Sequence, residues 1–169
     1  MSGVSDPTFL GTVSSVAGAT VTVGLTDSLA SGLAIIGGQT YRVAQVGSFV
    51  RIPLGYQDLY GVVSEVGATA PTARESDKSN MRWIRVELAG EAIGGQFERG
   101  LSQHPNIGDT VHTVVESDLR RIYGGEGDDQ VSIGTLASAE NISVKLSLNN
   151  LVTRHCAILG STGSASLPQ

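Results

Sequence analysis

Hydrophobic and polar residues alternate along much of the first 115 residues, which is the pattern of strands with one buried face. The alternation is clearest at 19–25, where Val21, Val23 and Leu25 share one face, and at 84–88. Gly-containing turns separate such runs, and helical periodicity is almost absent. Short strands joined in this way predict an all-β fold, a small antiparallel barrel or sandwich. The predicted strands are 9–16, 19–25, 40–52, 58–66, 84–88 and 110–115.

Several interruptions divide this pattern. Gly47 and Ser48 fall inside 40–52 and indicate a bulge or a sharp bend. The polar stretch 68–80 predicts a long, mobile loop. Two short helical segments are expected, one turn over 27–32 with Asp27 as its N-cap, and a helix over 117–123.

The end of the chain has a different character. Strands are expected at 131–136 and 144–148, and Asn149-Asn150 is interpreted as a turn. The run Cys156–Leu159 then reads as a short buried strand followed directly by a Gly-rich turn. A strand followed by such a turn is how the phosphate-binding P-loop, G-x-x-x-x-G-K-[ST], begins. The candidate nucleotide-binding residues are therefore Gly160, Ser161, Thr162, Gly163 and Ser164.

This P-loop is incomplete. Counted from Gly160, the Gly, the Lys and the hydroxyl residue should stand where the chain has Ala165, Ser166 and Leu167. The Lys neutralises phosphate charge and the hydroxyl holds magnesium, so we expect the partial P-loop to be inactive and the chain not to be an enzyme. We interpret 165–169 as a cloning or frameshift tail, and we expect no cofactor for this chain.

Composition narrows the function classes. The chain has 169 residues, 22 of them Gly, and its net charge is -5. The negative charge argues against binding to nucleic-acid phosphates as its main function. Its one cysteine, Cys156, excludes an internal disulfide and is consistent with a reducing cytoplasm. The N-terminal residues lack the pattern of a signal peptide, and no apolar run approaches the length of a membrane span. We therefore expect a soluble, cytoplasmic protein with no membrane partner.

The other residues that could carry chemistry are interpreted as structural rather than functional. His155 and Cys156 are neighbours on a predicted strand, so they point to opposite faces and cannot form a dyad. His104 and His112 lack the spacing of a zinc site, the acidic 126–129 segment lacks the EF-hand pattern, and no metal site is expected. Arg120-Arg121 is explained as helix capping. Phe97, in a segment with no core periodicity, is either an interface anchor or an inward residue at a barrel-closing bend.

Several stretches together resemble the N-terminal region of HerA-type DNA translocases, hexameric ATPases of the HerA/FtsK class. The most specific is Leu151–Ser164, which is similar to the beginning of that family's ATPase core. Gly11–Val13, Tyr41–Pro53 and Ile133–Leu136 are similar to the preceding small β-barrel, called the HAS-barrel.

The resemblance implies a domain order. Residues 1–8 are expected to be a flexible N-terminus, 9–150 the HAS-like barrel, and 151–164 the first strand of a RecA-like α/β ATPase domain that is truncated here. In this family the barrel helps to assemble the ring and docks effector enzymes, such as nucleases in DNA end processing or effectors of anti-phage systems. ATP and Mg²⁺ would belong to the full-length parent, which would contact DNA through its ATPase core.

The main expectation is therefore an assembly and docking barrel whose partners are copies of itself, in a ring, and an effector or nuclease. Two alternatives stay open. The chain could be a non-functional fragment of the ATPase, or it could be a nucleic-acid-binding barrel of the OB type, against which the low aromatic content and the net charge weigh.

Overall fold

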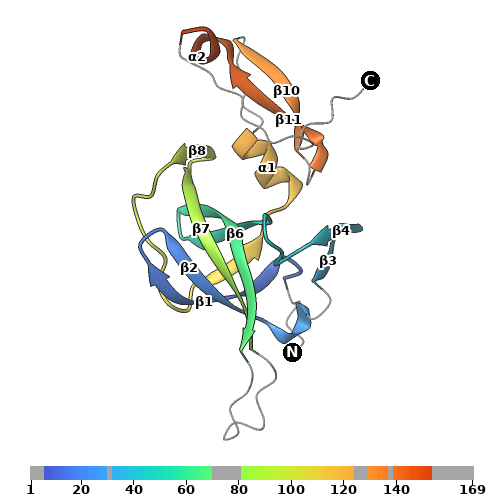
Figure 1. The fold of residues 1–169 in the computed structure, drawn as a ribbon, viewed down its shortest axis with the longest axis vertical. Coiled ribbons are helices and arrows are strands. Elements are labelled where there is room, and N and C mark those ends of the chain that lie inside the picture. The colour runs from blue at the N-terminus through green and yellow to red at the C-terminus, as the bar shows by residue number, and fades with distance from the viewer. Residues whose placement is uncertain (1–5, 30–31, 70–80, 124–128, 137–138, 154–169) are drawn as a thin grey trace, which may run out of the picture. The chain divides into compact units, whose positions relative to one another are not determined.

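The computed structural model describes residues 6–29, 32–69, 81–123, 129–136 and 139–153 (Figure 1). The chain divides into two compact units, residues 1–122 and 123–169. None of the helices in the described ranges is long and apolar enough to cross a membrane.

A closed barrel of six antiparallel strands forms the first unit. Neighbouring strands follow the order β2-β1-β9-β5-β6-β7, and pairing of β7 with β2 closes the ring. The predicted all-β barrel with short helices is therefore confirmed. The barrel strands are β1 (Phe9–Ala17), β2 (Thr20–Leu25), β5 (Phe49–Leu54), β6 (Gln57–Thr69), β7 (Met81–Ile93) and β9 (Thr110–Thr113).

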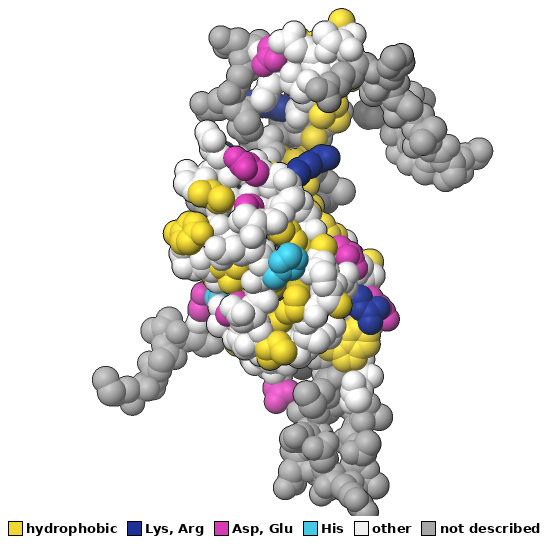
Figure 2. All heavy atoms as spheres, turned by 90° about the vertical axis from the view of Figure 1, so that its left-hand side faces the viewer, with side chains coloured by type: hydrophobic (Ala, Val, Ile, Leu, Met, Phe, Trp, Pro, Cys, Tyr) yellow, Lys and Arg dark blue, Asp and Glu magenta, His cyan; other side chains and the backbone are white. Residues whose placement is uncertain are grey.

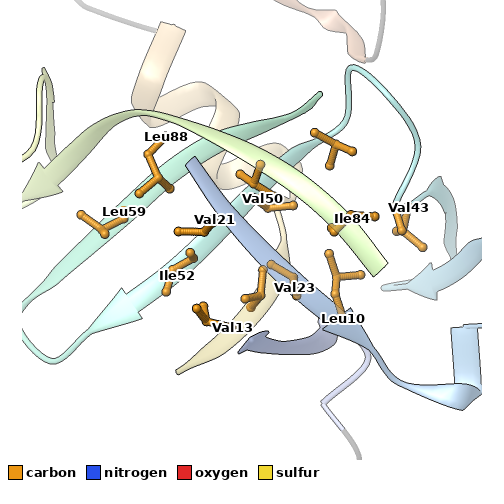
Figure 3. Packing of buried hydrophobic residues seen from close by; sticks show 14 of the residues in the cluster. Leu10, Val13, Val21, Val23, Val43, Val50, Ile52, Leu59, Ile84 and Leu88 are labelled. Carbon is orange, nitrogen blue, oxygen red and sulfur yellow. The ribbon is translucent and has the colours of Figure 1, made fainter. Parts of the chain in front are cut away.

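The alternating apolar residues supply the core. Val21 and Val23 of β2 stand opposite Val86 and Ile84 of β7, and all four side chains are fully buried. Figure 3 shows side chains from several strands converging on this shared interior, among them Ile52. Burial of each such Val, Leu or Ile stabilises the fold by about 1.5–3 kcal/mol before the loss of conformational entropy is counted. The period-2 pattern thus defines the inner face of the barrel.

β6 and β7 form the longest hairpin. The first part of β7 pairs with β2, and its last four residues pair with β8 (Gln96–Arg99), which extends the sheet past the point of closure. The predicted strands 58–66 and 84–88 therefore belong to longer strands.

The predicted strand 40–52 is wrong as a single element. The chain instead forms a separate hairpin, β3 (Leu33–Ile36) with β4 (Gln39–Arg42), and then turns before β5 begins. Ala44 and Gly47 have φ angles of 54° and 88°, in the left-handed region that a continuous strand cannot contain. The Gly47 N–H donates to the carbonyl of Val63 at 2.8 Å, which fixes this turn against β6.

Both predicted helical segments of the first unit are present. A 3₁₀ turn, η1, covers Asp27–Leu29, and helix α1 covers Glu116–Tyr123. The buried Asp118 carboxylate accepts the Val115 N–H at 3.2 Å, while the Val115 carbonyl accepts the Asp118 N–H. This reciprocal pairing satisfies groups that the first turn of a helix otherwise leaves open.

The second unit contains β10 (Gln130–Leu136), β11 (Ala139–Ser147) and helix α2 (Leu148–Thr153). β10 and β11 pair with each other as a two-stranded sheet that is separate from the barrel sheet, although the sequence analysis counted them with the barrel domain. The expected turn at Asn149-Asn150 is wrong, because both residues lie in α2. The Ser147 hydroxyl accepts the Asn150 N–H at 3.4 Å and so helps to start this helix.

Candidate functional site

The partial P-loop, Gly160–Ser164, lies outside the described residues, as do His155 and Cys156. Its role in nucleotide binding therefore stays a prediction. The described part of the candidate site is the segment that leads into it, β10, β11 and α2.

Asp129 organises this segment. Its Oδ2 accepts hydrogen bonds from the Ser147 hydroxyl and from the Asn149 side-chain amide, each at 3.1 Å, and its backbone carbonyl accepts the Leu148 N–H at 2.6 Å. These three bonds tie the residue before β10 to the end of β11 and the first turn of α2. Sequence reasoning gave the acidic 126–129 segment no role and missed this contact, which joins residues 18 to 20 positions apart in the chain.

Comparison with known proteins bears on the same segment. Residues 131–164 match the helicase HerA central domain family. The segment resembles the HerA central domain. The chain is also 40% identical over 57 residues to the DNA double-strand break repair helicase HerA of Pyrococcus furiosus. This match covers 34% of the chain and 10% of that protein, so the chain spans about a tenth of the length of the relative it matches.

These two findings support a HerA-type relation, which the sequence analysis inferred from Leu151–Ser164 and three earlier stretches. The family match begins at residue 131, the second residue of β10, and includes the rest of the β10–β11 hairpin.

A second polar cluster lies on the outer face of the barrel. The Thr8 backbone N–H and hydroxyl donate to Asp6 Oδ1 at 2.9 and 2.7 Å. His112 Nδ1 of β9 lies 3.0 Å from Thr8 Oγ1 and 3.3 Å from Asp6 Oδ2. The His112 ring also packs edge-on against Phe9, with ring centroids 5.9 Å apart. These contacts attach the described start of the chain to β9.

Two pKa values in this cluster depart from their usual ranges. The hydrogen bonds from the Thr8 hydroxyl and N–H lower the pKa of the Asp6 carboxyl. Burial lowers the pKa of His112, and the nearby Asp6 carboxylate opposes part of that effect. The cluster therefore favours neutral His112 beside ionised Asp6, which suits a structural attachment. Sequence reasoning missed it because Asp6 and His112 are more than 100 positions apart.

Phe97 of β8 is half-buried and packs on the barrel surface. Its ring meets Tyr60 edge-on, with centroids 6.1 Å apart. Tyr60 stands directly opposite Gly90 of β7, and a Cβ atom at Gly90 would lie 2.6 Å from the Phe97 ring. Phe97 therefore needs the glycine beneath it. Tyr60 is 1% exposed, so Phe97 covers a buried side chain that is not part of the main core cluster. Both interpretations of Phe97, an interface anchor and an inward residue, stay predictions.

A buried carboxylate fastens the loop after β8. Glu91 of β7 is 5% exposed, and its Oε2 accepts the Ser102 N–H and hydroxyl at 2.9 and 2.8 Å. The Gln103 side-chain amide donates to the Tyr56 hydroxyl at 3.1 Å. Through these contacts the loop 100–109 is held at the end of the barrel where the β5–β6 and β7–β8 turns lie.

The other candidates have no shared site in the structure. His104 is exposed in the loop 100–109, whereas His112 belongs to the cluster with Asp6. Arg120 pairs with Glu116 one helical turn earlier, at 2.6 Å. Within the described residues, no three His, Cys, Asp or Glu side chains form a group that could hold a metal ion.

Proposed function

We propose that this chain is the assembly and docking barrel of a HerA-type DNA-translocating ATPase. The observation that carries the proposal is the order along the chain, because a closed barrel ends at β9 and a segment similar to the HerA central domain begins at residue 131. In this proposal the barrel associates with copies of itself and offers a surface to an effector or nuclease. ATP, Mg²⁺ and DNA would be handled by the central domain of a full-length cytoplasmic parent.

The proposal assigns no catalysis to this chain. A P-loop needs its Lys beside the phosphates and a hydroxyl on the magnesium ion, and the sequence has Ser166 and Leu167 at those positions. We expect calorimetric titration with ATP and Mg²⁺ to show no binding and an ATPase assay to show no turnover. Saturable ATP binding at micromolar concentration would instead show a working nucleotide site.

The barrel could also carry nucleic acid, and its surface offers one place to test this. Arg85 stacks over Trp83 at 5.7 Å, an arrangement that suits base stacking, but Arg85 also pairs with Glu65, which offsets its charge. We therefore expect single-stranded and duplex DNA to migrate unchanged at low salt in the presence of the chain. A shift that Trp83→Ala abolishes would favour the nucleic-acid-binding alternative over the docking barrel.

A further inference from the structure

Gln57 is a polar residue in the interior of the barrel. It is the first residue of β6, where it stands opposite Leu54 of β5 and Ile93 of β7, and it is 2% exposed. Neither Oε1 nor Nε2 of its amide has a hydrogen-bond partner among the described residues. A primary amide has two N–H donors and a carbonyl acceptor, and buried groups of this kind are nearly always hydrogen-bonded. The amide therefore needs a partner that the described chain does not supply.

A carboxyl group lies near this amide on the same face of the sheet. Side chains alternate along a strand, so Gln57 and Leu59 share the inner face of β6, and Leu59 stands directly opposite Glu91 of β7 (Figure 3). Gln57 and Glu91 are thus diagonal neighbours, whose Cβ atoms lie about 7 Å apart in such a pair, within reach of two long side chains. No direct hydrogen bond joins the two side chains.

Glu91 has acceptor capacity left for this neighbour. It is 5% exposed, and its Oε2 accepts the Ser102 N–H and hydroxyl at 2.9 and 2.8 Å. A carboxylate offers about four lone-pair sites, so the two bonds from Ser102 leave others for a further donor.

The loop after β8 closes this end of the barrel. Leu101 packs against the core cluster, Ser102 is bonded to Glu91, and Pro105 is buried. On the face that includes this loop, hydrophobic and uncharged side chains form a continuous surface (Figure 2). Bulk solvent therefore does not reach the Gln57 amide, and any molecule that binds there is enclosed by the protein.

Water is the smallest molecule that serves both groups. It can accept a hydrogen bond from the Gln57 Nε2–H and donate one to a Glu91 carboxyl oxygen, and buried waters typically make about three such bonds. A metal cation fits less well, because it takes several oxygen ligands and no three His, Cys, Asp or Glu side chains gather in the described ranges.

We propose that one buried water molecule binds between the Gln57 amide and the Glu91 carboxyl group at this end of the barrel. The water joins β6 to Glu91, and Glu91 holds Ser102, so the bound water is part of what fastens the loop after β8. This site belongs to the barrel itself and is independent of the assembly function proposed above.

NMR detection of water at the Gln57 amide in the full wild-type chain tests the site directly. A water molecule that tumbles with the protein gives NOE and ROE cross-peaks of opposite sign, and we expect this pattern at the Gln57 side-chain N–H protons. Gln103 is the matched control, because its side-chain amide is exposed and meets only rapidly exchanging surface water. If the Gln57 amide shows no such cross-peaks, or behaves like that of Gln103, the site does not exist.

Gln57→Met gives an independent test, because methionine keeps a similar length and removes the amide. If a water bridges Gln57 and Glu91, the variant loses those hydrogen bonds, and its urea unfolding midpoint should fall below that of wild type. Gln103→Met, at an exposed position, should leave the midpoint close to wild type. An unchanged or higher midpoint for Gln57→Met would show that the amide has no bound partner to lose, and would overturn the proposal.

Discussion

At the scale of single residues, the contact between Asp6, Thr8 and His112 links the start of the chain to β9 and makes stability depend on pH. His112 is partly buried, and burial lowers its pKa from the reference value of 6.5. The unfolded chain therefore binds a proton at this residue more readily than the folded chain does. The stability that neutral His112 contributes is complete above pH 6.5 and is lost as the pH falls through the lower pKa of the folded state.

We therefore expect the free energy of unfolding, measured by urea titration, to decrease as the pH is lowered from neutral through 6.5 and below. His112→Asn should flatten this pH dependence, even if loss of the contact with Phe9 lowers stability at every pH. His104→Asn is the matched control, since His104 is exposed and should leave the slope unchanged. An unaltered slope in His112→Asn would contradict this account of the cluster.

Asp6 acts in a lower pH range. Its pKa is lowered from 3.8 by hydrogen bonds from Thr8, so the stability it contributes is present above that value and is lost as the pH falls through the lower folded pKa. Because Asp6 is largely exposed, we expect this effect to be smaller than that of His112. Thr8→Val should remove the hydroxyl contact and bring the carboxyl pKa, followed by NMR titration, closer to 3.8.

At the scale of elements, α1 depends on the reciprocal bond between Asp118 and Val115. Asp118→Ala should lower the free energy of unfolding by about 0.5–2 kcal/mol, because it leaves the Val115 N–H without its side-chain acceptor. Asp118→Asn keeps an oxygen at that position and should lose less. Chemical denaturation of the three proteins measures the difference, and equal stability of the Ala variant and wild type would show that the cap is unimportant.

The β7–β8 hairpin depends on Gly90 in a different way. A Cβ atom there would lie 2.3 Å from the Glu98 carbonyl oxygen and 2.6 Å from the Phe97 ring. Gly90→Ala should therefore destabilise the fold by about 1–3 kcal/mol through overpacking. Gly24→Ala in β2 is the matched control, because no atom lies within 4 Å of the added Cβ and the cost should be small. A thermal unfolding midpoint for Gly90→Ala equal to that of Gly24→Ala would contradict this packing.

The elements also show what sequence reasoning could reach. Alternation such as Val21, Val23 and Leu25 identified most barrel strands because it reports which face is buried. It could not show that β7 pairs with β2 and closes the barrel, since that contact joins residues about 60 positions apart. Helix α2 was missed because its start depends on contacts with Asp129, across the β10–β11 hairpin.

The location of the candidate site along the chain could also be predicted from the sequence. The sequence pointed to the segment before Gly160 because a strand and a Gly-rich turn follow a recognisable order, and the HerA match covers that segment. The exposure of Ile35 and Ile107 was not foreseen, because it depends on the tertiary fold. Charge-free stretches such as 28–41 and 100–108 were the available signal.

At the scale of the whole molecule, the chain combines a closed barrel with a segment similar to a helicase central domain. The barrel has a fully buried core of its own, so assembly can be measured on this chain independently of ATP hydrolysis.

Sedimentation velocity of the wild-type chain across the micromolar range tests the proposed assembly function. We expect a mass well above the 17.5 kDa of one chain, increasing with concentration, because the barrel is proposed to associate with copies of itself. A single species of 17.5 kDa at every concentration would contradict it.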